Sequence, residues 1–191
     1  MRFLDALLGR TKPKASNLDA LFALPSAAVT LEAATGLRPS GNAGVCFKPT
    51  GGQAFAHTAE ELDQLLQLTT KDSTVETSRQ DDKYGYRWVT FSLLDLSELV
   101  TTVHLVNATL QANGFGPQLL CSVFSFRPGD GDSGCFLVYL YKRGTFYPFA
   151  PLDGERRDNE LELRLQGILA ADLPTEQDYS RWFPLWGLPV R

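Results

Sequence analysis

Residues 119–149, LLCSVFSFRPGDGDSGCFLVYLYKRGTFYPF, decide the fold of this chain. They contain three runs rich in aromatic and aliphatic residues, at 119–126, 135–141 and 145–149. Runs of this kind, separated by turns that contain Gly, Asp and Pro, are typical of β-strands. Because short turns join antiparallel neighbours, the stretch predicts an antiparallel arrangement rather than a parallel sheet.

The flanking sequence predicts further elements on both sides of this stretch. Strands are expected at 43–48, 74–80 and 84–92. Helices are expected where apolar residues recur every three or four positions, at 17–24, 58–69, 95–113 and 158–171. The clearest is 95–113, because Asp95 and Glu98 form a cap pair and Gly114 supplies a stop.

Proline and glycine predict where some of these elements end. The helix at 17–24 is expected to end at Pro25, because proline lacks the backbone N–H that a helix interior needs. Residues 26–36 fit a helix or a strand equally well, and residues 38–41, Arg-Pro-Ser-Gly, predict a turn.

Together these elements predict an α+β fold, an antiparallel sheet of about five to six strands flanked by helices. The order of elements resembles that of secretion chaperones. The chain has 191 residues, a length that favours one α+β domain over 17–191. Residues 1–16 are then expected to form a basic amphipathic helix and a linker.

Composition and cysteine usage indicate a cytoplasmic protein. Charged residues make up 21% of the chain and hydrophobic residues 43%, which is ordinary globular usage and excludes a wholly disordered chain. Cys46, Cys121 and Cys135 are widely spaced, so we expect free thiols and a reducing compartment. Cys121 and Cys135 lie on neighbouring predicted strands and can face each other. We find neither a signal peptide nor a run of about 20 apolar residues.

The N-terminus differs in charge from the remainder of the chain. Residues 1–14 carry a formal charge of +3, and the rest carries −7. An acidic body repels phosphate, so we expect no nucleic-acid partner. Residues 2–10 predict a short amphipathic helix that either docks on its own domain or contacts a partner or an anionic membrane. The candidate contact residues are Phe3, Leu4, Leu7, Leu8, Arg10, Lys12 and Lys14.

Residues 129–134, Gly-Asp-Gly-Asp-Ser-Gly, resemble three known site motifs. A dinucleotide loop would precede a helix, but this segment precedes a predicted strand. A calcium loop lacks the later glycine and acidic ligand that it needs. A hydrolase would use Ser133 with His57 or His104, and no pattern brings them together. We therefore expect a hairpin turn here, no catalytic residues, and no cofactor or metal site in the chain.

Several stretches along the chain resemble the PspA-associated protein PspAB family of actinobacteria. They are long enough to be specific and span nearly the whole chain: FLDALLGR at 3–10, LFALP at 21–25, KRGTFYPF at 142–149, RDNE at 157–160 and RWFPLWG at 181–187. They are not chemical motifs, so the resemblance implies no catalytic residue.

The resemblance implies a companion of PspA, a coiled-coil protein of membrane stress, without enzymatic activity. We therefore expect a non-enzymatic adaptor or regulator in the envelope-stress (phage-shock) response. It would bind a PspA-type protein in the cytoplasm and make peripheral contact with the inner membrane face. Two alternatives stay open: a secretion-chaperone-like module that binds a peptide in a groove, and a hydrolase that uses Ser133.

Overall fold

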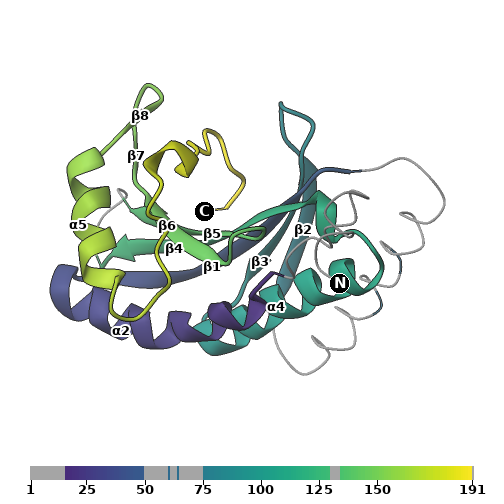
Figure 1. The fold of residues 1–191 in the computed structure, drawn as a ribbon, viewed down its shortest axis with the longest axis horizontal. Helices are drawn as coiled ribbons and strands as arrows, with labels where there is room; N and C mark the ends of the chain where they lie inside the picture. The colour runs from purple at the N-terminus through teal and green to yellow at the C-terminus, as the bar shows by residue number, and fades with distance from the viewer. Residues whose placement is uncertain (1–15, 50–59, 61–63, 65–74, 130–133, 191) are drawn as a thin grey trace, which may run out of the picture.

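A six-stranded antiparallel sheet forms the centre of the molecule (Figure 1). The computed structural model describes residues 16–49, 60, 64, 75–129 and 134–190. The strands follow the order β2-β3-β1-β4-β5-β6. Their bounds are β1 Leu37–Phe47, β2 Glu76–Asp81, β3 Arg87–Ser92, β4 Leu119–Pro128, β5 Cys135–Leu140 and β6 Thr145–Phe149. A two-stranded ribbon, β7 (Pro151–Leu152) with β8 (Arg156–Arg157), extends from the end of β6.

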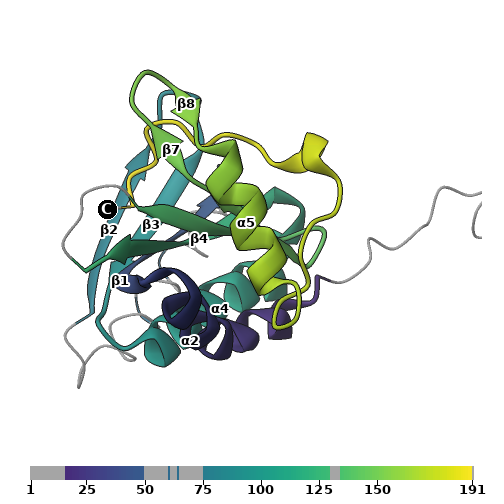
Figure 2. The same cartoon turned by 90° about the vertical axis from the view of Figure 1, so that its left-hand side faces the viewer.

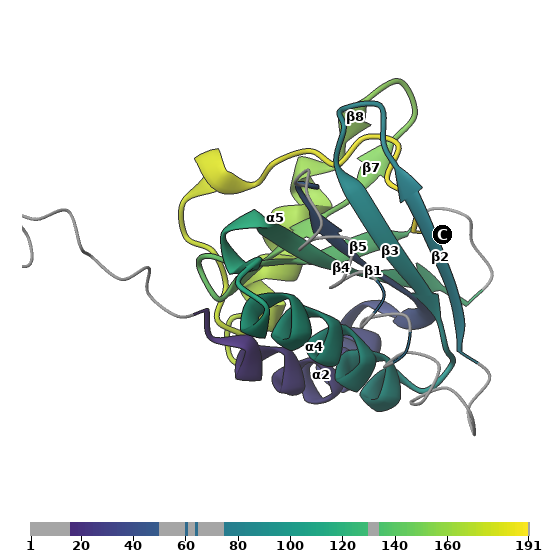
Figure 3. The same cartoon turned by 90° about the vertical axis from the view of Figure 1, so that its right-hand side faces the viewer.

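Helices cover one face of the sheet. The 3-10 helix η1 (Leu18–Ala23) continues into α2 (Leu24–Thr35), and α4 (Leu96–Ala112) lies beside them (Figure 3). Helix α5 (Asn159–Leu169) packs at the β6 edge of the sheet and also contacts α2 (Figure 2). Two short 3-10 turns, η2 (Gly116–Gln118) and η3 (Tyr179–Arg181), complete the described elements.

The main core lies between these helices and the sheet. Leu24 and Leu31 of α2, Val103 of α4 and Leu165 of α5 are fully buried there. Leu18–Thr35 is the one described helical stretch long and apolar enough, by length and composition alone, to cross a membrane. Its buried leucines pack against the sheet, which accounts for its apolar character as that of a core helix.

The opposite face of the sheet carries a second, smaller core. Residues on adjacent strand positions point to opposite faces. Thus Val89 packs under the helices, whereas Trp88 packs on the other side. The chain after α5 crosses this second face, where Trp182 and Val190 are buried (Figure 1). We call residues 174–190 the C-terminal strap.

The structure confirms the predicted α+β class and most of its elements. The strands predicted at 43–48, 74–80, 84–92, 119–126, 135–141 and 145–149 are present. Their ends shift by at most three residues, except that β1 begins at Leu37, six residues before the predicted start. The predicted helix 95–113 is α4, with the Asp95 side chain accepting from the backbone N–H of Glu98. The predicted helix 158–171 is α5, capped by Asp158.

Two predictions about proline are wrong. Pro25 does not end a helix but lies in the first turn of α2, where the missing N–H would have no intrahelical acceptor. Residues 38–41 do not form a turn between elements, because β1 runs through them. The pairing of β1 with β4 shifts register between Pro39 and Ala43 instead, so an irregularity in the strand accommodates the proline.

Several predictions fall outside the described residues. These are the N-terminal helix at 2–10, most of the helix at 58–69, His57, and Asp130–Ser133 of the Gly-Asp motif. The division into residues 1–16 and a domain at 17–191 also stays a prediction.

Candidate binding groove

A groove of about 450 Å³ opens on the face of the sheet opposite the helices. One row of directly opposed residues crosses four strands to form its floor: Trp88 on β3, Cys46 on β1, Cys121 on β4 and Leu140 on β5. Opposed residues of antiparallel neighbours share a face. The two cysteines in the middle are much smaller than the flanking Trp88 and Leu140, so the row is lowest at its centre.

The two groove cysteines, Cys46 and Cys121, oppose each other on neighbouring strands. The side-chain hydrogen bond with Cys121, followed by burial, raises the pKa of Cys46 far above its ordinary value. The thiolate is the nucleophilic and metal-binding form of cysteine, so the raised pKa of Cys46 disfavours both roles for this residue. Cys121 and Cys135 do lie on neighbouring strands, but they do not face each other: Cys135 opposes Phe126 and is buried on the helix side. All three thiols are free, as expected.

The turn between β2 and β3 forms one end of the groove. Asp82 organises this turn: Oδ1 accepts from the backbone N–H groups of Tyr84 and Tyr86, each at 2.9 Å, and Oδ2 accepts from Trp88 Nε1 at 3.1 Å. Both carboxylate oxygens are therefore already hydrogen-bonded. The rings of Tyr84 and Tyr86 line the groove at its open edge.

The C-terminal strap forms the opposite wall and begins as an addition to the sheet edge. The N–H of Phe146 on β6 donates to the Pro174 carbonyl at 2.8 Å, and the N–H of Glu176 donates to the Phe146 carbonyl at 2.7 Å. This parallel bridge joins Phe146 to Thr175. It occupies part of the free edge of β6 and directs the following residues across the sheet.

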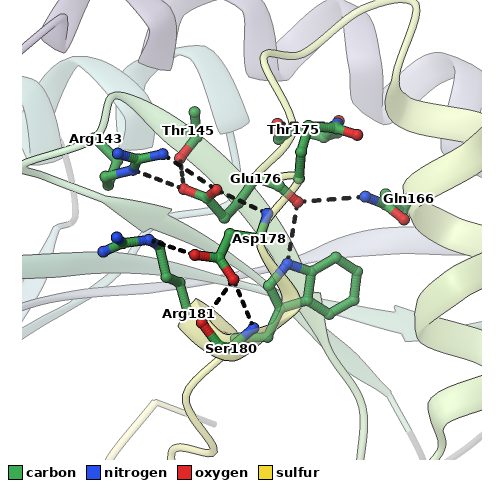
Figure 4. Close-up of polar contacts among 10 residues, drawn as sticks. Arg143, Thr145, Gln166, Thr175, Glu176, Asp178, Ser180 and Arg181 are labelled. Carbon is green, nitrogen blue, oxygen red and sulfur yellow. Dashed lines mark hydrogen bonds and ion pairs between the residues drawn. The ribbon is translucent and has the colours of Figure 1, made fainter.

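Glu176 is the central anchor of the strap (Figure 4). Its buried carboxylate accepts from Arg143 Nε at 3.0 Å, from Thr145 Oγ1 at 2.9 Å and from the N–H of Asp178 at 3.0 Å. Burial alone would raise its pKa, but these hydrogen bonds and the Arg143 charge outweigh burial and lower the pKa below its ordinary value. The Glu176 carbonyl also accepts from Gln166 of α5, which ties the strap to that helix.

An ion pair between Arg157 and the buried Glu162 fixes the middle of the strap. Arg157 Nη2 lies 2.8 Å from Glu162 Oε2, and Arg157 Nη1 donates to the Trp182 carbonyl at 2.7 Å. The Tyr147 hydroxyl then donates to the Phe183 carbonyl at 2.8 Å. Burial raises the pKa of Tyr147 well above its ordinary value, so the hydroxyl stays a donor. These contacts hold the backbone at 182–183 and leave the Phe183 ring half-exposed at the groove.

Charge at the groove is mostly positive, in contrast to the acidic body of the chain. Lys142, Arg143 and Arg181 line it, together with the single acid Asp82. Arg143 pairs with Glu176 and Arg181 with Asp178, and both arginine side chains remain about half exposed. Lys142 is exposed and forms no ion pair with any of the residues that the structure describes.

Most of the site residues predicted from sequence lie outside the part of the chain that the structure describes. The contact residues Phe3, Leu4, Leu7, Leu8, Arg10, Lys12 and Lys14 lie outside the described residues, as does Ser133. His104 lies on α4, where its ring packs against Phe22 at a tilt of 38° and its Nε2 lies 3.7 Å from Asp19 Oδ1. Across the described ranges, no group of three or more His, Cys, Asp or Glu residues is arranged to hold a metal ion.

Sequence reasoning missed the groove because its floor depends on strand pairing. In the aromatic stretches at 146–149 and 182–186, Phe146, Tyr147, Phe149 and Trp182 are buried. Phe183, however, is 55% exposed. The sequence does contain one sign of a second packed face: Tyr86 and Trp88 alternate with Arg87 and Val89, which is typical of a strand with two different faces.

Comparison with known proteins identifies the family but supplies no structural neighbour. No curated protein and no solved structure was found to match the chain, so the secretion-chaperone likeness remains one of element order. A family model described as PspA associated protein B matches residues 1–190. Because this match covers nearly the whole chain, the protein belongs to the PspAB family, the family of PspA associated protein B.

Proposed function

We propose that this protein is a non-enzymatic adaptor of the envelope-stress (phage-shock) response that binds a PspA-type coiled-coil protein in the cytoplasm. The observation that carries the proposal is the match of residues 1–190 to a family described as PspA-associated. The groove supports a binding role, because its lining is mainly apolar. A concave apolar surface with a few polar groups at its edge is typical of binding sites.

Residues 1–14 supply a second contact in this proposal. Their charge of +3 and the apolar residues Phe3, Leu4, Leu7 and Leu8 suit peripheral contact with the anionic inner face of the membrane. Each basic residue near such a surface contributes about 1 kcal/mol. The contact is therefore weak and reversible, and the PspA-type partner would strengthen it by providing a second attachment.

The test is calorimetric titration of the full chain with the purified PspA-type protein of the same organism. We expect heat of binding and co-elution of the two proteins. The absence of both would refute the adaptor function. Membrane contact is tested separately by flotation with vesicles containing phosphatidylglycerol. Reversing Arg10, Lys12 and Lys14 to Glu should abolish flotation and leave the calorimetric affinity unchanged.

The groove also favours a second candidate, a module that binds an extended peptide as secretion chaperones do. This candidate differs from the adaptor in what it binds. An adaptor binds its partner in the folded state, whereas a chaperone-like module binds the unfolded chain more tightly. Titration with native and urea-unfolded PspA-type protein, each diluted into the same buffer, distinguishes the two.

A further inference from the structure

We propose that the groove between the β2–β3 turn and the C-terminal strap is the docking site for an acidic, amphipathic segment of the PspA-type partner. This inference rests on the proposed function and assigns its surface. Aliphatic side chains of the segment enter the groove over Cys46 and Cys121. Its carboxylates meet Lys142, Arg143 and Arg181 at the edge.

The shape of the groove favours a polypeptide side chain as occupant. The two small cysteine side chains leave a hollow between Trp88 and Leu140, and the surrounding surface is apolar. Tyr84 and Phe183 stand at the margin with 59% and 55% of their surface exposed. Large aromatic residues at the edge of an apolar hollow are the residue types that carry most binding energy in protein interfaces.

Charge selects an acidic occupant. Three basic side chains and one acid, Asp82, line the groove. Arg143 and Arg181 are paired with Glu176 and Asp178, which lie outside the lining, and about half of each arginine side chain stays exposed. Lys142 is therefore the basic side chain of the lining that has no ion pair with any described residue. This basic edge lies on a chain whose residues after 14 carry a net charge of −7. An acidic segment is therefore attracted to Lys142 and to the exposed sides of the two arginines, whereas the net negative charge of the chain opposes its binding elsewhere.

The same charges argue against the chain's own N-terminus as the occupant. Residues 1–14 carry +3, so their entry into a groove edged by Lys142, Arg143 and Arg181 would bring like charges together. Like-charge contacts oppose association. In this proposal, residues 1–14 contact the membrane and the groove binds the partner.

The fold holds the groove open in a defined form. The backbone at Trp182 and Phe183 is fixed by Arg157 and Tyr147, and Glu176 fixes the start of the strap. The hydrogen bonds from Arg157 and Tyr147 are accepted by the backbone carbonyls of Trp182 and Phe183. The Phe183 ring takes no part in these two hydrogen bonds. A substitution of that ring therefore changes the groove surface without releasing the strap.

The test compares binding of the purified PspA-type protein by four full-length variants with that of the wild type. Phe183→Ser removes an edge aromatic, and Lys142→Glu reverses an edge charge. Leu94→Ser and Arg164→Glu are matched controls: Leu94 is 92% exposed before α4, and Arg164 is exposed on α5. We expect Phe183→Ser to weaken binding at least about tenfold, Lys142→Glu to weaken it about fivefold at low salt, and both controls to bind like the wild type.

A second measurement locates the partner and excludes unfolding as the cause. The chain has three tryptophans; Trp88 and Trp186 line the groove, whereas Trp182 stacks on Tyr147 beside it. In chain labelled with 5-fluorotryptophan, addition of the partner should shift the fluorine signals of Trp88 and Trp186 more than that of Trp182. The spectra of the free variants show directly whether each one is folded.

The outcomes separate this inference from the proposed function. If the wild type binds and the groove variants bind equally well, or if the Trp88 and Trp186 signals do not move, the groove assignment is overturned and the adaptor function stands. If the signals move with phosphatidylglycerol vesicles and not with the partner, the groove takes a lipid and the assignment is again overturned. If the wild type does not bind the partner, both proposals fail.

Discussion

Replacing Glu176 by Gln should release the C-terminal strap from the sheet edge. The variant keeps the shape of the side chain but replaces one acceptor oxygen by an NH₂ group. The buried carboxylate receives hydrogen bonds from Thr145 and from the N–H of Asp178, besides those from Arg143. The amide has one acceptor oxygen instead of two. At least one of the N–H or O–H groups that donate to Glu176 therefore faces the NH₂ group of the glutamine and loses its acceptor.

The cost follows from the contacts that are lost. One unsatisfied buried donor costs about 1–3 kcal/mol, and loss of charge in a remaining hydrogen bond costs up to about 1 kcal/mol. Because Arg143 is half exposed, water replaces its contact and we assign little energy to it. We expect the free energy of unfolding to fall by about 2.5 kcal/mol, which lowers Tm by roughly 5–10 °C for a chain of this size.

Scanning calorimetry of wild type and variant measures this change, and its pH dependence checks the cause. The folded-state pKa of Glu176 lies below its ordinary value of 4.5. Its stabilisation is thus complete above about pH 4.5 and is lost as the pH falls through the lower, folded-state pKa. The difference between wild type and variant should therefore shrink below pH 4.5.

A matched control is Glu32→Gln, which removes an exposed ion pair with Arg38. Such surface pairs contribute at most about 1 kcal/mol, so this variant should melt close to the wild type. If Glu176→Gln melts within 2 °C of the wild type, or if its deficit does not change with pH, Glu176 does not anchor the strap.

Three further substitutions test other parts of the groove. Asp82→Ala removes the acceptor of the β2–β3 turn and should lower the free energy of unfolding by about 1–2 kcal/mol in urea titration; a smaller loss would mean that the turn forms without it. Gly44→Ala places a Cβ 2.7 Å from Val190 Cγ2. It should displace the end of the strap and speed carboxypeptidase digestion, whereas an unchanged rate would argue against that contact. Cys121→Leu fills the groove floor and should weaken partner binding while keeping Tm within a few degrees of the wild type; unchanged affinity would show that the floor is not used.

Strands β4, β5 and β6 were predictable because each carries its own local sequence pattern. The runs at 119–126, 135–141 and 145–149 are apolar, short and separated by turn residues, so sequence alone defines them. Helix α4 was predictable for the same reason, since its cap and its apolar stripe lie within one segment. The helix end predicted at Pro25 and the turn predicted around Pro39 were wrong, because the effect of a proline depends on whether the N–H that it lacks would have had a hydrogen-bond partner.

The groove was not predictable because it depends on pairings between distant segments. Cys46 opposes Cys121 only because β1 lies between β3 and β4, and no local pattern encodes that order. The anchor Glu176 likewise has no recognisable pattern around it in the sequence. Its partners Thr145, at the start of β6, and Arg143, in the turn before it, are more than 30 residues away along the chain. The family, by contrast, was recognisable from sequence, since the matching stretches extend along most of the chain.

Hydrogen exchange with mass spectrometry, on the full chain alone and with the purified PspA-type protein, shows whether the partner covers the groove. If the protein acts through this groove, binding should slow exchange in peptides covering the β2–β3 turn at 82–86 and the strap at 181–188. Peptides of α4 on the opposite face should be unaffected. Protection confined to the helix face, or no protection anywhere, would contradict the account.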